Sequence, residues 1–400
     1  MMPPRIRLVF AFFALSPLAG MGLAADDANL KGLYDSHQWF DLRDAIRHTR
    51  APALYRGAVA AAFNDSKAAE SILRPLIAAA PQSPGASDAR DWLTYLYMRS
   101  GEYRKAASLP GEMQAILSHL PDQSVASRRT SAVPWRMEHR LLFIPVSIGG
   151  KPARFCVDTD SNFSVVSETE ARLLGLKMQT SDSNVGVTGA TGKSSGRFRT
   201  AVAGELTVGQ FRLRNVAFLV LSDDTALFRD LPPEQQGVLG IPVSLAFQTL
   251  SFGRDGMLRI GFASRRPPAR ASNLCFDGSD PLTSFEFQGR PLTSFLDTGD
   301  EVTEIWPPFA RRFAAFVTRA GVKGTRVESG YGGEVKIDEM VMPELSIRIG
   351  GLDVSLRPAH VLLTETVPSS KWYFARLGLD ALSLGRRVTI DFRSLTLSIE

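Results

Sequence analysis

The hydrophobic and polar positions of the chain form a pattern that occurs twice. Arg154–Val166 read RFCVDTDSNFSVV, and Thr293–Trp306 read TSFLDTGDEVTEIW. Each stretch has an apolar run, an Asp-Thr pair, a short polar turn and a second apolar run. The two aspartates, Asp158 and Asp297, lie 139 positions apart. Short apolar runs separated by polar turns are typical of strands, so each stretch is predicted as strand, turn and strand.

A hairpin is predicted before each of these stretches. In the first copy the apolar run Leu141–Ile148 is followed by the turn Gly149–Pro152. In the second copy Phe285–Phe287 is followed by the turn Gln288–Pro291. Both turns contain Gly and end in Pro, which are the residues that most often interrupt regular structure.

The likeness continues after the Asp-Thr turns. GVLGI at 237–241 corresponds to ARLGL at 375–379, and LSFGRDGMLRI at 250–260 corresponds to VTIDFRSLTLSI at 388–399. A single Asp-Thr-Gly tripeptide is a weak signal, whereas two Asp-Thr turns in equivalent places of a repeat are a strong one. The pattern therefore predicts a mainly β fold with two similar lobes.

Residues 29–120 have a different composition. They are rich in Ala, Leu and Arg and poor in β-branched residues, which favours helices. Asn64–Ser66 is a capping signal before an apolar helical stretch that Pro81 ends, and Ser87 is expected to start the next helix. The order of helix, short turn and helix resembles tetratricopeptide-type repeats. A plain small helical bundle is the alternative.

The first residues indicate a secretory signal peptide. Arg5 and Arg7 are the positive start, Leu8–Leu23 is almost wholly apolar, and Gly22–Ala24 offers small residues for cleavage. The apolar run is short for a spanning helix, so cleavage and a periplasmic or secreted location are expected, with no membrane span afterwards. The predicted organisation is a signal peptide (1–24), a helical domain (25–120), a linker (121–135), lobe one (136–263), a linker (264–272) and lobe two (273–400).

Composition narrows the functional classes only slightly. The 400 residues are 44% hydrophobic and 22% charged, which is ordinary for a soluble globular protein. The formal net charge of +5 falls when the leader is removed, and the basic residues form no long run, so nucleic acid is not an expected partner. Cys156 and Cys275 could pair in an exported protein, or remain as buried thiols.

Residues 136–400 resemble the aspartic peptidases of the pepsin and retropepsin type. That family has two β lobes that each supply one Asp from an Asp-Thr-Gly turn, with a hydrophobic-hydrophobic-Gly segment crossing behind it. The resemblance implies that Asp158 and Asp297 are the catalytic pair. It places the crossing segments at Val238–Gly240 and at Arg376–Gly378, where Arg376 is a poor match.

The resemblance also assigns supporting roles in the two turns. Thr159 and Thr298 would hydrogen-bond across the lobes, Gly299 would let its backbone approach a carboxylate, and Ser161 would orient Asp158. Two carboxyl groups in near contact share one proton, so the pair could activate water and protonate the scissile carbonyl of a peptide or protein substrate. Such chemistry needs no metal and no cofactor.

Two Gly-rich hairpins correspond to substrate flaps in the resembled family. The first is NVGVTGATGKSSG at 184–196, with Thr188 and Gly189 at its centre, and the second is ESGYGGE at 328–334, with Tyr331 and Gly332. A phosphate-binding loop is excluded for the first, because its glycine spacing is wrong and a strand-like pattern follows it.

Two residues depart from the family pattern in the turns. Asp160 stands where the family has Gly, and Asp300 stands where Ser, Thr or Ala is usual. A third carboxylate beside the pair would either raise the pH at which the pair works or distort the turn and silence it. Three functions therefore stay open: an exported endopeptidase, a silent peptide-binding protein, or a protein whose working part is a docking surface for a protein partner on the helical domain.

Overall fold

The computed structural model describes residues 28–180, 187–188, 194–195, 198–262, 272–330 and 333–400. The predicted signal peptide, most of the predicted linker 264–272, and the flap residues Gly189, Tyr331 and Gly332 lie outside these ranges. In the described part, no helix is long and apolar enough to cross a membrane.

The described part of the chain begins with a helical unit at residue 28, as the composition of residues 29–120 predicts. Residues 28–35 are helical, and the helices that follow are α2 (Trp39–Ile46), α3 (Ala53–Ala62), α4 (Ser66–Ala79), α5 (Pro84–Arg99), α6 (Tyr103–Ala107) and α7 (Gln114–Leu117). The Asp65 side chain caps α4 by accepting a hydrogen bond from the Ala68 N–H at 3.0 Å. Helix α5 starts earlier than Ser87, because Ser83 caps it and Pro84 occupies its first position.

The predicted linker 121–135 differs from the expectation, because it holds two short strands. β1 (Ser124–Ser127) pairs with β11 of lobe one, and β2 (Ser131–Pro134) pairs with β14. Each is the outermost strand of its sheet. An edge strand exposes much of its length to solvent, which explains why a paired segment has the polar composition of a linker.

Lobe one is built around a nine-stranded sheet within the described residues, with the strand order β1-β11-β6-β12-β5-β4-β10-β7 and β3 beside β4. Its elements are β3 (Arg136–Glu138), β4 (Leu141–Ile148), β5 (Lys151–Val157), β6 (Ser164–Ser167), α8 (Glu168–Leu174), β7 (Met178–Thr180), β8 (Val187–Thr188), β9 (Ser194–Ser195), β10 (Arg199–Val208), β11 (Phe211–Leu221), β12 (Gly237–Leu239), α9 (Ile241–Phe247), β13 (Thr249–Gly253) and β14 (Met257–Ile260).

Lobe two repeats this plan in a sheet ordered β19-β20-β23-β18-β24-β17-β16-β21-β22, with β15 beside β16. Its elements are β15 (Leu274–Asp277), β16 (Asp280–Phe287), β17 (Arg290–Leu296), β18 (Glu304–Ile305), α10 (Pro307–Arg312), α11 (Ala314–Ala320), β19 (Val322–Gly330), β20 (Gly333–Met342), β21 (Leu345–Ile349), β22 (Leu352–Leu356), β23 (Ala359–Leu362), β24 (Ala375–Leu377), α12 (Leu379–Leu382), β25 (Arg387–Asp391) and β26 (Thr396–Ile399).

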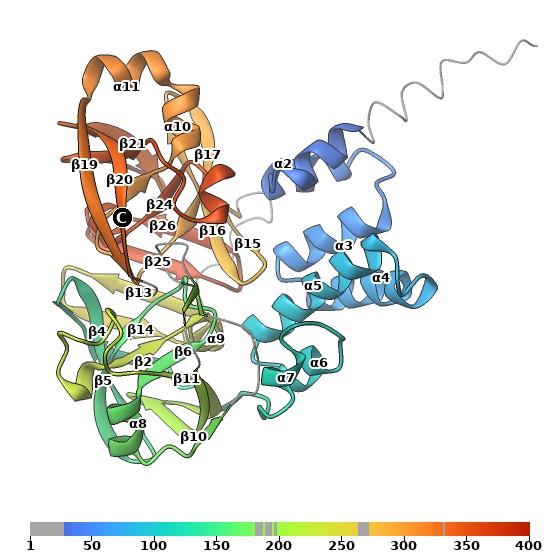
Figure 1. The fold of residues 1–400 in the computed structure, drawn as a ribbon, viewed down its shortest axis with the longest axis vertical. Helices are drawn as coiled ribbons and strands as arrows, with labels where there is room; N and C mark the ends of the chain where they lie inside the picture. The colour runs from blue at the N-terminus through green and yellow to red at the C-terminus, as the bar shows by residue number, and fades with distance from the viewer. Residues whose placement is uncertain (1–27, 181–186, 189–193, 196–197, 263–271, 331–332) are drawn as a thin grey trace, which may run out of the picture.

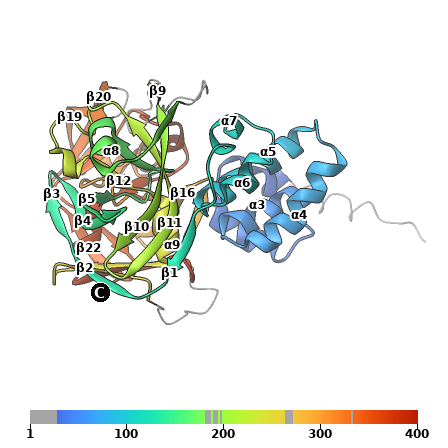
Figure 2. The same ribbon diagram turned by 90° about the horizontal axis from the view of Figure 1, so that it is seen from below.

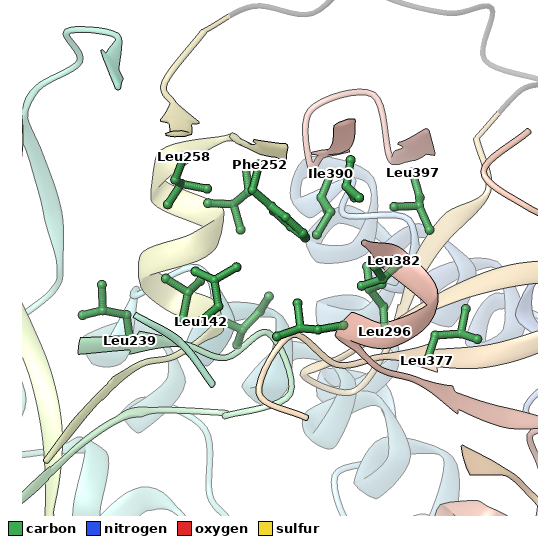
Figure 3. Packing of buried hydrophobic residues seen from close by; sticks show 14 of the residues in the cluster. Leu142, Leu239, Phe252, Leu258, Leu296, Leu377, Leu382, Ile390 and Leu397 are labelled. Atoms are coloured by element: carbon green, nitrogen blue, oxygen red, sulfur yellow. The ribbon is translucent and has the colours of Figure 1, made fainter. Parts of the chain in front are cut away.

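A third sheet joins the lobes and carries the core that lies between them. Its order is β2-β14-β13-β25-β26, so β13 of lobe one pairs with β25 of lobe two, with Leu250 opposite Ile390. These are the strands that the matching ends of the two sequence copies predict. Figure 3 shows their apolar side chains facing Leu239 and Leu377, which belong to the crossing strands behind the two Asp turns.

The helical unit packs against both lobes. It lies beside them in Figure 1, and the perpendicular view in Figure 2 shows the same arrangement. The buried Arg99 of α5 donates hydrogen bonds to the carbonyls of Ala61 and of Gly278 in lobe two. Tyr103 of α6 stacks on Phe163 of lobe one, with 5.9 Å between ring centroids. The predicted fold class, two similar β lobes preceded by a helical domain, is confirmed.

Candidate active site

The two Asp turns are held in the same way by the strand that crosses behind each of them. Strand β5 leads into Asp158, whose N–H donates to the Leu239 carbonyl of β12 at 3.0 Å. Strand β17 leads into Asp297, whose N–H donates to the Leu377 carbonyl of β24 at 3.1 Å. Because β12 and β24 are buried strands, both aspartates start from rigid backbone rather than from a free loop.

The glycine after the first crossing strand is required by close packing. A Cβ atom at Gly240 would lie 2.5 Å from the carbonyl oxygens of Ser161 and Phe163, which is far inside contact distance. The Ile241 N–H donates to the same Ser161 carbonyl at 2.8 Å, and in lobe two the Leu379 N–H donates to the Asp300 carbonyl at 2.8 Å. The hydrophobic-hydrophobic-Gly segments therefore lie where the resemblance implies.

Two threonines join the turns across the lobes by reciprocal hydrogen bonds. The Thr159 N–H donates to Thr298 Oγ1 at 3.2 Å, and the Thr298 N–H donates to Thr159 Oγ1 at 3.1 Å. Each hydroxyl then donates to a carbonyl of the opposite lobe, Thr159 to Leu296 at 2.7 Å and Thr298 to Val157 at 2.8 Å. Both side chains are buried, so these four bonds fix the relative position of the turns without competition from water.

The two carboxyl groups meet at Gly299. Its N–H donates to Asp297 Oδ1 at 2.7 Å, and a Cβ atom at Gly299 would lie 2.4 Å from the Asp158 carboxyl carbon. A side chain at this position would therefore displace the Asp158 carboxyl. Asp158 Oδ1 also accepts hydrogen bonds from the N–H groups of Asp160 at 2.8 Å and Ser161 at 3.2 Å.

Burial raises the pKa of both carboxyl groups. Desolvation is the first cause for each, and it brings the pKa of Asp158 to about 6. The pKa of Asp297 lies well above its ordinary value, through burial first and the negative charge of Asp158 second. The guanidinium of Arg376 lowers both pKa values in part. Two such neighbours lose their protons in separate steps, so the pair holds one proton over a range of pH.

Asp160 is accommodated in the first turn without backbone strain. It is not among the described non-glycine residues with positive φ, so the position does not demand glycine. Burial raises the pKa of the Asp160 carboxyl well above its ordinary value, and the carboxylates of Asp280, Asp297 and Asp158 raise it further. The Asp160 carboxyl therefore lies within electrostatic reach of the pair, and its turn keeps the N–H hydrogen bond to Asp158.

Ser161 supports Asp158 through its backbone and not through its hydroxyl. The Ser161 N–H donates to Asp158, as described above, whereas Ser161 Oγ donates to the Phe163 carbonyl at 2.7 Å. The hydroxyl thus stabilises the turn locally. The role that the resemblance gives to this side chain is taken by the main chain.

Sequence reasoning missed a buried ion-pair cluster beside Asp297. Arg376 of β24 is 8% exposed, and its Nη2 lies 3.1 Å from Glu304 Oε2 and 2.5 Å from Asp300 Oδ2. Its Nε lies 3.9 Å from Asp297 Oδ2. Arg376 and Asp300 are separate departures from the family pattern in sequence. Their opposite charges were the only available sign that they compensate each other.

The described part of the flaps is limited to their strands. Thr188 lies in β8, where it pairs with Ser194 of β9. In lobe two, β19 and β20 pair along their whole length, from Val322 opposite Val341 to Gly330 opposite Gly333. Gly189, Tyr331 and Gly332 lie outside the described residues, so their predicted contact with substrate stays a prediction.

Comparison with known proteins supports the aspartic peptidase class. Residues 144–243 match the family model described as aspartyl protease, which spans the first Asp turn and its crossing strand. No curated protein matches the chain.

Many solved structures are similar in part, among them two aspartic proteases. A retropepsin-like aspartic protease from Rickettsia conorii is 14% identical, with a TM-score of 0.24 over 34% of this chain and 90% of that one. An aspartic proteinase from Irpex lacteus is 15% identical, with a TM-score of 0.38 over 67% of this chain and 96% of that one.

Proposed function

We propose that this chain is an exported aspartic endopeptidase that hydrolyses peptide bonds with the Asp158–Asp297 pair. The observation that carries the proposal is the reciprocal bonding of Thr159 and Thr298, because it brings one Asp turn from each lobe to a common centre. These reciprocal hydrogen bonds require two Asp-Thr turns, and a single turn could not form them. The aspartyl protease match over residues 144–243 supports the same class.

The proposed reaction uses the shared proton of the pair. The ionised carboxylate accepts a proton from a water molecule, and the water oxygen attacks the scissile carbonyl carbon. The protonated carboxyl donates its proton to the carbonyl oxygen. The tetrahedral intermediate then collapses: the carboxyl that took the proton from water gives it to the amide nitrogen, a hydroxyl of the intermediate gives a proton to the other carboxylate, and the C–N bond breaks. No covalent enzyme intermediate is required.

The first experiment replaces one member of the pair. Asp297→Asn is expected to abolish hydrolysis of an unfolded protein substrate between pH 3 and 8, because an amide cannot take part in proton sharing. Asp353→Asn, an exposed aspartate of β22, is the matched control and should retain full activity. Inhibition by pepstatin should accompany the activity. Equal hydrolysis by Asp297→Asn and the parent chain would rule out the pair.

A silent peptide-binding protein is the second candidate, and two observations favour it. Asp160 and Arg376 place charged side chains where the family has Gly and an apolar residue, and Arg376 Nε lies 3.9 Å from the Asp297 carboxylate. A cation that kept both carboxyl groups ionised would remove the shared proton and so prevent the pair from protonating a carbonyl. Peptide binding without turnover at any pH would establish this candidate instead.

The leader and the helical unit belong to the same proposal. A periplasmic or secreted location rests on the signal-peptide pattern of residues 1–24, and a mature N-terminus shortly after Ala24 would support it. A protein partner is proposed for the tetratricopeptide-like helices. Because the helical unit packs against both lobes, the test changes its surface and keeps the unit in place: in a pull-down from the exported fraction, Lys67→Glu on the exposed face of α4 should weaken capture of such a partner while hydrolysis is retained.

A further inference from the structure

The two lobes differ at equivalent places behind their Asp turns. In lobe one, Val238 of β12 lies opposite Cys156 and Val165, so the strand is surrounded by apolar side chains. In lobe two, Arg376 of β24 lies opposite Phe295 and Glu304. One half of the repeat thus has an apolar core behind its aspartate, and the other half has a buried charge cluster.

The lobe-two cluster extends from the second Asp turn to the flap hairpin. Glu304 bonds to Arg376 on one side and forms an ion pair with Arg326 of β19 on the other. Arg326 Nε lies 3.9 Å from Glu339 Oε2 of β20, and His360 Nδ1 lies 2.9 Å from the same oxygen. The side chains of Glu304 and Glu339 are buried, so water screens these charges only weakly.

We propose that Arg376 is a positioning residue of the Asp158–Asp297 pair, which is called the dyad from here on. Its buried guanidinium offsets the nearby carboxylates and sets the pH range over which Asp158 and Asp297 share one proton. The inference rests on the proposed peptidase function. Burying a guanidinium is costly unless it is paired, and here Asp300 and Glu304 supply that pairing.

The groups around Arg376 determine the direction of its effect. The charged and titratable side chains that face this region are Asp297 and Asp300 of the second turn, Glu304 of β18, Arg326 of β19, Glu339 of β20, His360 of β23, Asp380 of α12, and Asp158 and Asp160 of lobe one. Most are acids, which favour the protonated dyad. Arg376 is the cation next to Asp297 and favours the ionised one.

Asp300 opposes Arg376 at the dyad. The negative charge of Asp300 raises the pKa of both Asp158 and Asp297, whereas Arg376 lowers both. Asp300 is therefore the partner that holds Arg376 in place and also the charge that Arg376 offsets. Replacing the two together removes a balanced pair, and replacing one alone unbalances the site.

The test compares four chains: the parent, R376M, D300S and R376M/D300S. Methionine restores an apolar residue in the crossing segment, and serine is usual at position 300 in the resembled family. R376M should move the upper limb of the pH–activity profile to higher pH by roughly one unit, because an opposite charge at this range shifts a carboxyl by about 1–3 units. D300S should move the limb to lower pH, and the double variant should lie near the parent.

Controls separate charge from packing. R376K keeps the cation and should keep the parent profile, and V238L changes the equivalent place in lobe one without adding charge. If R376M fails to fold because Asp300 is left without its cation, the step from D300S to R376M/D300S measures the same loss of charge in a background that lacks Asp300. A uniform loss of activity with no movement of either limb would overturn the proposal.

A second readout does not depend on hydrolysis. Carboxyl-carbon NMR titration of the same chains should show the aspartates of the dyad ionising at higher pH in R376M than in the parent. If the parent chain cleaves nothing, the proposed function fails, but this titration still tests Arg376. Identical titrations in the parent and R376M would refute the role of Arg376 even in an active enzyme.

Discussion

At the scale of single residues, Asp160 is the departure with the most direct effect on chemistry. Asp160→Gly should move the upper limb of the pH–activity profile to lower pH while activity is kept, because it removes one acid that lies within electrostatic reach of the pair. Fewer neighbouring negative charges let the Asp158–Asp297 pair lose its proton earlier. Asp160→Asn is the matched control, since it removes the charge but keeps the side-chain volume, and it should shift the limb in the same direction. An unmoved limb in both variants would mean that Asp160 does not couple to the pair.

At the scale of elements, the hydrogen bonds of Thr159 and Thr298 between the two Asp turns are the interaction to test by mutation. Thr298→Val should lower the free energy of unfolding by about 2–4 kcal/mol, because the Thr159 N–H and the Val157 carbonyl each lose a buried partner. Thermal unfolding measures the loss, and peptidase activity should fall with it as the turns separate. Thr298→Ser keeps the hydroxyl and should cost less than about 1 kcal/mol. Equal stability of the Val and Ser variants would show that the hydroxyl does not join the lobes.

At the scale of the whole molecule, buried acids make stability depend on pH in an unusual direction. Burial raises the pKa of Asp280, which faces the helical unit near Arg99, to about 8. A carboxyl whose folded pKa exceeds its unfolded value binds more protons when folded, so its contribution to stability is lost as pH rises from about 4 to 8. Asp280→Asn should therefore flatten the fall of the melting temperature over this range and stabilise the chain at pH 8 by roughly 1–2 kcal/mol.

The control for Asp280 is an exposed aspartate. Asp230→Asn should leave the pH dependence of the melting temperature unchanged, since Asp230 lies at the surface. Asp158 and Glu170, whose pKa values burial raises to about 6 and about 7, contribute in the same direction and remain in both variants. A melting temperature that rises from pH 4 to pH 8 in the parent chain would contradict the prediction.

Some features of the fold and the site could be predicted from the sequence, and others could not. The repeat predicted both lobes and both Asp turns, because alternating runs and turn residues are local signals. It did not predict the Arg376 cluster, because Glu304 and Arg376 become neighbours only when β18 pairs with β24. Residues 121–135 were predicted to be a linker, because a short polar edge strand lacks the apolar pattern of a central strand. The features that the sequence did not predict are therefore those that depend on pairing between strands far apart in the chain.

The inequality of the two crossing strands makes the two aspartates unequal. In a site with two identical halves, either aspartate could hold the shared proton with the same free energy. Because the repeat lies within one chain, Val238 and Arg376 could diverge independently, and a change on one side is not copied to the other. Asp158 therefore stands before a neutral strand and Asp297 before a charged one, so the shared proton has a preferred position on one of the two aspartates before any peptide is bound.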